Sequence, residues 1–334
     1  MTTLCETVRQ ITGAESVSLG KTIQSLWSGY GVIQRASLGM VDANGLPRNV
    51  PVVIKHIDIS SKRINPRGWG SERSHQRKVH SYRVEKTFYE CFSDVCDQSC
   101  WVPQLLAAHE RENSEGWLIV LTDLDDCGFN YRKSEPGSND VRACLSWLAN
   151  FHATFLGNAG EGLWPIGTYW HLQTRPDELS AMRAGPLKQY AQVIDNRLNS
   201  ATFQTLVHGD AKVANFCFPR RQSDPVAAVD FQYVGRGCGM KDVAYFISSC
   251  LSEEEAAKQE EALLGCYFQK LQQAIASRGL DLRFSDLEDE WRSLYPFAWA
   301  DFCRFLSGWS PGHWKLNSYT ERITKTVTDQ LRLE

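Results

Sequence analysis

The stretch that decides the fold is His208-Gly209-Asp210-Ala211-Lys212-Val213-Ala214-Asn215, which Asp230-Phe231-Gln232 follows along the chain. Apolar runs that we expect to be short strands enter and leave these polar segments. The Asp210 carboxylate and the Asn215 amide can therefore converge on one loop, and Asp230 leaves its strand pointing at the same place. Such oxygen groups suit Mg²⁺ and the activation of a hydroxyl nucleophile. A hairpin with solvated polar ends is the alternative, which so demanding a pattern disfavours.

A lysine and a glutamate upstream are the second feature. Strict alternation over residues 52–59 puts Lys55 on the face that Val53 and Ile57 share, where a lysine needs a partner. Glu85 falls within the apolar arc of the helix predicted over residues 74–95, and a carboxylate there is costly unless it is paired. Either residue alone would more often be a charge that reaches water. Together they predict an internal ion pair.

A glycine turn is the third feature. Gly29 and Gly31 flank Tyr30 between two predicted strands, and such a turn could let backbone amides approach phosphates. Taken alone the signal is weak, because two glycines in a hairpin are more often only a hairpin, and Gln34 occupies the third position of a GxGxxG spacing.

Turn signals and periodicity predict a strand-rich start and a helical remainder. We expect antiparallel strands over 21–27, 32–38 and 50–59, the helix over 74–95, and strands over 105–110 and 117–121. A connector over 123–128 leads to a helix over 140–156, three short strands over 206–207, 216–218 and 226–229, and a helix that begins at the capping box Ser252/Glu255 and ends at Gly279. These elements divide the chain into an N-terminal lobe, residues 1–122, and a C-terminal lobe, residues 123–334.

Composition narrows the class of protein. A chain of 334 residues with 43% hydrophobic residues is long enough for two packed subdomains and is not globally disordered. Its 36 basic and 39 acidic residues are interspersed, so we expect neither a nucleic acid nor an anionic membrane as partner. The 11 cysteines form no CxxC pair and read as reduced thiols. With no apolar run near the ~20 residues of a membrane helix and no leader, we expect a cytoplasmic protein.

The order of these parts resembles the protein-kinase-like fold. Within it, the sequence is similar to the aminoglycoside phosphotransferase and choline kinase group, in which His-Gly-Asp replaces the His-Arg-Asp of protein kinases. The segment Val229-Asp230-Phe231-Gln232 resembles the ecdysteroid kinase-like branch most closely. The resemblance runs from about residue 20 to residue 250 and implies an α+β, two-lobed fold, with an N-terminal antiparallel sheet and one helix, a mainly helical C-terminal lobe, and ATP·Mg²⁺ between the lobes.

The resemblance implies a role for each matching residue. Asp210 would orient or deprotonate the acceptor hydroxyl, and Asn215 and Asp230 would hold Mg²⁺ on the ATP phosphates. Lys55, fixed by Glu85, would hold the α and β phosphates, with Gly29 and Gly31 in the turn that covers them. The remaining implied roles belong to His208 and Asp242, which would support the catalytic loop, and to the backbone around Leu121 and Asp123, which would face adenine. The implied activity is transfer of the γ-phosphate to a hydroxyl of a small molecule.

Lys212 departs from the pattern of the small-molecule kinases. It stands two residues after Asp210, as in protein kinases, where it reaches the γ-phosphate; here it could stabilise charge, contact an acidic acceptor or point to solvent. A protein kinase is disfavoured because Asp230 is followed within twelve residues by Asp242, too short a distance for an activation segment. A pseudokinase or interaction module without catalysis is the rival from another class, weakened because every expected polar position is filled.

The acceptor stays open at this stage, among an antibiotic, a choline-like amine, a sterol and a sugar. The C-terminal region holds many aromatic residues with carboxylates among them, which could box an alkylammonium ion by cation–π contact. Packing is the favoured use of these residues. His152 lies on an apolar helix face and is predicted to be a hydrogen-bonded core residue rather than a ligand.

Overall fold

The computed structural model describes residues 3–26, 29–59, 72–111, 116–221 and 225–334. Contacts divide the chain into two compact units, residues 1–95 with 102–131 (unit 1) and residues 96–101 with 132–334 (unit 2). The boundary at 122/123 stays a prediction. Trp27, the last residue of the first predicted strand, the turn residue Ser28 and the turn segments 112–115 and 222–224 lie outside the described residues.

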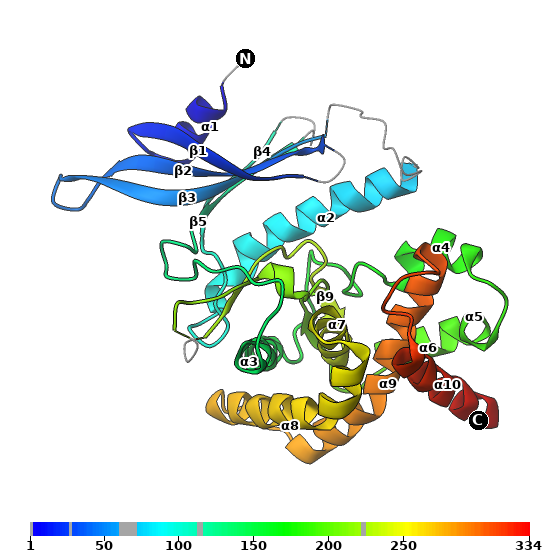
Figure 1. The fold of residues 1–334 in the computed structure, drawn as a ribbon. Coiled ribbons are helices and arrows are strands. Elements are labelled where there is room, and N and C mark those ends of the chain that lie inside the picture. Colours follow the sequence, from blue (N-terminus) through cyan, green and yellow to red (C-terminus); the bar gives the residue numbers. More distant parts are fainter. Residues whose placement is uncertain (1–2, 27–28, 60–71, 112–115, 222–224) are drawn as a thin grey trace. The chain divides into compact units, whose positions relative to one another are not determined.

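Unit 1 is built on a five-stranded antiparallel sheet with the order β1-β2-β3-β5-β4 (Figure 1). The three-strand start is confirmed, and β5 inserts between β3 and β4, so that its residues are covered on both edges. Lys55 lies in the middle of the sheet, opposite Ile33 on one side and Ile119 on the other. The strands are β1 (Ser16–Ser25), β2 (Gly31–Val41), β3 (Pro47–Asp58), β4 (Leu105–Glu110) and β5 (Gly116–Thr122).

Each face of this sheet is covered by one helix (Figure 1). Helix α1 (Leu4–Thr12) places Val8 in a cluster with Leu38, Ile54 and Val120, which are the strand residues of one face. The long helix α2 (Glu72–Cys91) packs on the other face, where Tyr82 meets Trp117 and Glu85 meets Lys55. Two-sided burial of the central strands explains why an inward lysine had to find a carboxylate there.

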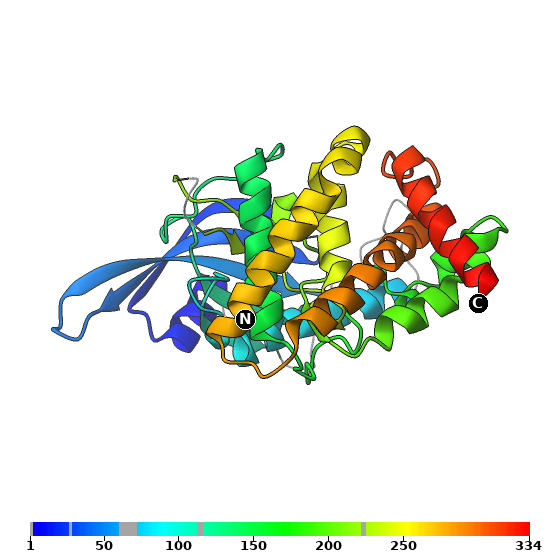
Figure 2. The ribbon, with the colours of Figure 1, turned by 90° about the horizontal axis from the view of Figure 1, so that it is seen from below.

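Unit 2 is mainly helical, and most of its helices pack against one central helix, α9. The helix α3 lies along α8, whereas α4, α6, α7 and α10 all pack against α9 (Figure 2). Two pairs of short strands fix the loops between these helices in the described part of the chain, with β6 antiparallel to β9 and β7 antiparallel to β8. The elements are α3 (Ser138–Thr154), α4 (Pro176–Ala181), α5 (Pro186–Gln189), α6 (Ala191–Asn199), β6 (Thr205–Val207), β7 (Phe216–Cys217), β8 (Ala227–Ala228), β9 (Gly235–Gly237), α7 (Met240–Cys250), α8 (Glu253–Ser277), α9 (Phe284–Trp309) and α10 (Ser318–Leu333).

The aromatic C-terminal region serves mostly as core, as favoured from the sequence. On α9, Trp291, Trp299 and Phe302 are buried, and Trp170 and Tyr245 join Phe302 in one cluster. A fully buried ion pair, Asp301 with Arg304, lies beside Trp170. Within the described residues, no helix is both long enough and apolar enough to span a membrane.

The predicted helix over 74–95 was wrong at its end. The α-helix stops at Cys91, and Ser93–Val95 form a separate 3₁₀ turn that leaves Val95 58% exposed. The helix that begins at the Ser252/Glu255 capping box is confirmed, with Gly279 at φ 64° just beyond its end.

Candidate active site

Asp242 anchors the loop that carries the predicted catalytic residues. Its fully buried carboxylate, on the first turn of α7, accepts the backbone N–H of His208 at 2.6 Å and of Gly209 at 2.9 Å. It also accepts a bond from His152 Nε2 at 3.2 Å. Because one carboxylate satisfies two consecutive loop amides, the loop between β6 and β7 is fixed to α7 immediately before Asp210.

Gly209 is required at its position by both conformation and space. Its φ is 79°, and a Cβ there would lie 2.1 Å from the Tyr233 carbonyl oxygen. No side chain fits so close an approach, and the left-handed backbone favours glycine. The turn at Gly209 therefore directs the following residue, Asp210, away from β6.

His208 stabilises the loop through hydrogen bonds at both of its ring nitrogens. Its Nδ1 accepts the backbone N–H of Asp210 at 3.3 Å, so the ring proton must be on Nε2, which donates to the Val229 carbonyl at 3.0 Å. The ring packs against Phe231 with 4.7 Å between ring centroids. One neutral imidazole thus ties the segment before Asp210 to the segment before Asp230.

The Asp210 carboxylate is held on both oxygens. Oδ1 accepts the Tyr245 hydroxyl at 2.9 Å, and Oδ2 accepts Lys212 Nζ at 2.7 Å and Asn215 Nδ2 at 3.2 Å. Burial, followed by the charge of Asp210, raises the pKa of Tyr245 well above its usual value, so this hydroxyl stays a donor. A carboxylate with fixed donors on both oxygens is oriented before any substrate arrives.

Lys212 contacts Asp210 directly and is not merely a solvated charge. Burial opposes its charged form, but the carboxylates of Asp210 and Asp230 outweigh that effect and raise the pKa of Lys212. The side chain nevertheless keeps 40% of its surface exposed. An ammonium that is both paired and accessible can bind a second anion.

Asn215 and Asp230 come from neighbouring strand ends. The Val229 N–H donates to the Asn215 carbonyl at 3.0 Å, directly beside the β7–β8 pairing. The Asn215 side-chain nitrogen bonds to Asp210, so the amide oxygen is the atom of this side chain that could bind a metal. Asp230 adopts a left-handed backbone, with φ 71°, which aspartate tolerates better than most residues.

The donor chemistry of this pair fits Mg²⁺. An amide oxygen and a carboxylate are hard ligands, and Mg²⁺ is commonly held by one or two carboxylates together with phosphates and water. Gln232 Nε2 donates to Asp230 Oδ1 at 2.6 Å and so orients the carboxylate. Among the described residues, no cluster of three or more His, Cys, Asp or Glu side chains could hold a metal by itself.

The predicted ion pair of unit 1 is present. Lys55 Nζ lies 2.5 Å from Glu85 Oε2, and the two side chains are only 4% and 3% exposed. The ammonium also lies over the ring of Tyr82, 5.7 Å from its centroid. A pair so well removed from water holds the lysine in one position.

The remaining predicted residues of unit 1 have structural constraints of their own. A Cβ on Gly31 would lie 1.9 Å from the His56 carbonyl oxygen, so this glycine is needed for strand packing whatever else it does. Leu121 pairs with Val53 and Leu105 inside the sheet. Asp123 pairs with Arg35 at 3.2 Å, and its carbonyl accepts the N–H of Asp126. Gly29 has φ 72° and donates its N–H to the Leu26 carbonyl.

Sequence reasoning missed several residues around Asp210. Gln232 was quoted with its motif but given no role. Tyr245 stands three residues after Asp242 and could have been noticed, whereas Lys315 carries no sequence signal at all. His152, predicted as a core residue, is fully buried and bonded to Tyr267 and Asp242.

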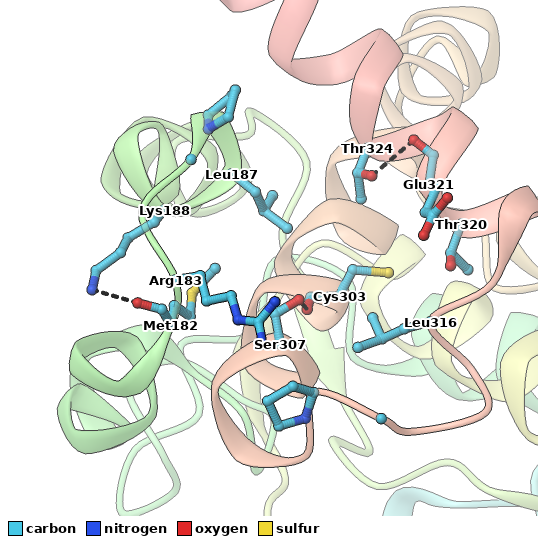
Figure 3. Close-up of a pocket in the computed structure, with 14 residues that line it drawn as sticks. Met182, Arg183, Leu187, Lys188, Cys303, Ser307, Leu316, Thr320, Glu321 and Thr324 are labelled. Carbon is cyan, nitrogen blue, oxygen red and sulfur yellow. Dashed lines mark hydrogen bonds between the residues drawn. The ribbon is translucent and has the colours of Figure 1, made fainter.

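Unit 2 also contains a cavity of about 630 Å³ away from this loop (Figure 3). Figure 3 shows Arg183 directed from the loop after α4 toward the side formed by Cys303 and Ser307, with Glu321 of α10 across the cavity. Lys188 donates to the carbonyls of Ser180 and Met182 and so fixes that loop. Of the described residues that line the cavity, none is a predicted site residue.

Comparison with known proteins gives a family match over part of the chain and a shared fold. The model of the ecdysteroid kinase-like family matches residues 168–280, which include the loop at Asp210 and the whole of α7. No curated protein matches the sequence.

Similar solved structures are small-molecule kinases. The microcompartment-associated aminopropanol kinase has 10% identity and a TM-score of 0.50, over 95% of this chain and 93% of that one. Amicoumacin kinase, solved with AMP-PNP and Ca²⁺, has 11% identity and a TM-score of 0.46, over 94% and 88%. A thermostable mutant of aminoglycoside phosphotransferase APH(4)-Ia has 12% identity and a TM-score of 0.44, over 96% and 98%.

Sequence identities of 10–12% support a shared fold and not a shared substrate. The predicted resemblance is confirmed: residues 168–280 match the ecdysteroid kinase-like family model, and the α+β fold is similar to that of the aminopropanol kinase.

Proposed function

We propose that the protein is an ATP- and Mg²⁺-dependent phosphotransferase that moves the γ-phosphate to a hydroxyl of a small-molecule acceptor. The observation that carries the proposal is the Asp210 carboxylate, held on both oxygens by Tyr245, Lys212 and Asn215. Phosphoryl transfer asks mainly for positioning and for neutralisation of charge, and this loop offers both.

In the proposed reaction, Asp210 accepts the proton of the acceptor hydroxyl while that oxygen bonds to the γ-phosphorus. The bond from the γ-phosphorus to the bridging oxygen breaks, and that oxygen leaves on ADP. Lys212 would stabilise the negative charge on the transferred phosphoryl group. Its ammonium contacts Asp210 Oδ2, and part of its side chain stays accessible.

The phosphates are the proposed ligands of the remaining charged residues. Asn215 and Asp230 would hold Mg²⁺, which neutralises phosphate charge when bound. Lys55, kept in place by Glu85, would bind the α and β phosphates. The glycines at 29 and 31 and the backbone near Leu121 and Asp123 would contact the nucleotide, and His208 and Asp242 would act only by positioning the loop.

Nucleotide binding is tested first, because it does not depend on the acceptor. Melting temperature is measured for wild type, Asp230→Asn and the surface control Asp281→Asn, with ATP and with or without Mg²⁺. Asparagine tolerates the left-handed backbone at 230, so this variant removes charge with little strain. At 100-fold excess over Kd, Mg·ATP should raise the melting temperature of wild type and the control by about 5 °C.

The effect should be lost in Asp230→Asn. No Mg²⁺-dependent shift in wild type would overturn the nucleotide site. Asp210→Asn should keep the shift but lower turnover of any acceptor found by an ADP-release screen by about 10²–10⁴-fold. Unchanged turnover in that variant would overturn the proposed role of Asp210, and nucleotide binding without turnover of any acceptor would favour a pseudokinase.

A further inference from the structure

Lys315 occupies an aromatic cage in unit 2. It lies between α9 and α10, and its Nζ is 5.1 Å from the ring centroid of Tyr245, 5.4 Å from that of Phe302 and 5.5 Å from that of Trp314. We call these three rings the lysine cage. Rings at this distance attract a cation through their electron-rich faces, and such cages commonly bind ligands that carry an ammonium group.

The ammonium of Lys315 has no carboxylate partner among the described residues. Its one hydrogen bond there is to Ser248 Oγ, at 3.2 Å. Burial lowers the pKa of Lys315 to about 8, although the Asp210 carboxylate acts in the opposite direction. A cation that is withdrawn from water and that no carboxylate of the described residues contacts directly is the state that an incoming anion would stabilise.

The cage adjoins the proposed catalytic loop. Tyr245 forms one wall of the cage and donates its hydroxyl to Asp210 Oδ1 at 2.9 Å. On the same helix, α7, Ser249 Oγ accepts the backbone N–H of Val213, so the helix that carries the cage wall also touches the loop. Trp314, on the outer side of the cage, is 61% exposed.

Resting on the proposed function, we infer that Lys315 determines which acceptors bind. The ammonium of Lys315 fills the lysine cage, so acceptors that carry an ammonium group are excluded. The acceptor is instead a compound with both a hydroxyl, which is phosphorylated, and an anionic oxygen group, which Lys315 binds. The side chain of Lys315 therefore occupies the aromatic site that could otherwise have bound an alkylammonium ligand.

Charge beside the cage favours the same kind of acceptor. Lys212 adds a second ammonium next to Asp210 and lowers the pKa of Lys315 by repulsion. An ammonium-bearing acceptor would face both lysines, whereas a carboxylate, sulfate or phosphate monoester would lie against them favourably.

The test uses two probes of equal length and opposite charge, n-butylammonium and butyrate, at the same ionic strength. Binding is followed by melting temperature. Wild type is compared with Lys315→Ala, which empties the cage, and with Lys315→Met, which keeps it filled but removes the charge. Arg183→Gln, in the separate cavity, is the matched control for loss of a cation elsewhere in unit 2.

Wild type and Arg183→Gln should be stabilised by butyrate, by about 2 °C at ten times Kd, and not by n-butylammonium. Lys315→Ala should show the reverse preference, and Lys315→Met should respond to neither probe. The inference is overturned if n-butylammonium stabilises wild type as much as butyrate does, or if butyrate still stabilises Lys315→Met. If Lys315→Ala does not fold, the comparison of wild type with Lys315→Met decides.

Sources of the anion are separated by repeating the measurement with methyl sulfate and inorganic phosphate. The strongest shift that Lys315→Met abolishes identifies the group. The Mg·ATP shift is recorded for every variant and should be unchanged in all of them. Its loss in wild type would refute the proposed function, while a normal Mg·ATP shift with the wrong probe preference would refute only the role of Lys315.

Discussion

Lys55 in unit 1 and Lys315 in unit 2 are both withdrawn from water, but their surroundings differ in kind. Lys55 has a carboxylate at 2.5 Å, from Glu85 on a helix of the same unit. Lys315 has three rings and a serine hydroxyl. The first lysine is neutralised within the fold, and the second keeps its charge available. A buried lysine is therefore not necessarily part of an ion pair within the fold.

The largest expected effect is on stability, from breaking the pair of unit 1. Lys55→Met removes the ammonium that lies 2.5 Å from the buried Glu85 carboxylate, so the free energy of unfolding should fall by about 3–5 kcal/mol, measured by urea denaturation. Lys258→Met, in an exposed pair with Glu254, is the control and should change it by less than about 0.5 kcal/mol. The double variant Lys55→Met/Glu85→Leu should recover most of the loss; no recovery would show that the loss is not due to an unpaired charge.

The pH dependence of stability should reveal the cost of the charge on Lys315. Since its pKa is lowered from 10.5 to about 8, the unfolded chain binds more protons between these values, and stability relative to Lys315→Met should rise as the pH increases from about 8 to 10.5. The full gain is about 3 kcal/mol, and below pH 8 it is absent. A difference that stays flat over this window would contradict the lowered pKa.

Taking the difference between wild type and Lys315→Met is necessary because other groups titrate nearby. Those that act on Lys315 or lie beside it are Asp210 and Lys212 on the catalytic loop, Tyr245 and Cys250 on α7, Cys303 on α9 and His313 on its own loop. Burial raises the pKa of Cys250 and of Cys303 to about 12, so neither thiol ionises appreciably in this window.

Neutralising Lys315 at pH 7 should not reduce stability. Lys315→Met removes a charge that costs about 3 kcal/mol by the same linkage and strands no carboxylate, so the free energy of unfolding should rise, by up to about 3 kcal/mol. A loss as large as that of Lys55→Met, under the same urea conditions, would show that the cage is a stabilising contact comparable with the ion pair.

The two lysines also mark how far the sequence could predict this molecule. Lys55 and Glu85 were predictable because strand alternation and helical periodicity each place an ionisable group on an apolar face. The start of the helix after Ser252 was predictable because a capping box is formed by residues only three positions apart. Both cases depend on short-range patterns in the sequence. The signal for α1 was present too, in the capping box that Thr3 and Glu6 form, and was overlooked.

Lys315 could not be predicted because its surroundings are assembled from distant parts of the chain. Tyr245 comes from α7, Phe302 from α9 and Trp314 from the loop between α9 and α10, and no spacing relates them. The end of α2 was missed for a related reason. Val95 matches the helical period, yet the chain turns away after Cys91, so periodicity continued where the helix did not.

The lysine cage can also be regarded as a receptor with a tethered competitor. Because the Lys315 ammonium is attached to the chain that forms the cage, its effective concentration is on the order of millimolar or higher, however dilute the protein. A free amine would have to outcompete it at every encounter. Shortening one side chain would remove that competitor, so the identity of a single residue, at position 315, could separate two acceptor preferences on an otherwise unchanged scaffold.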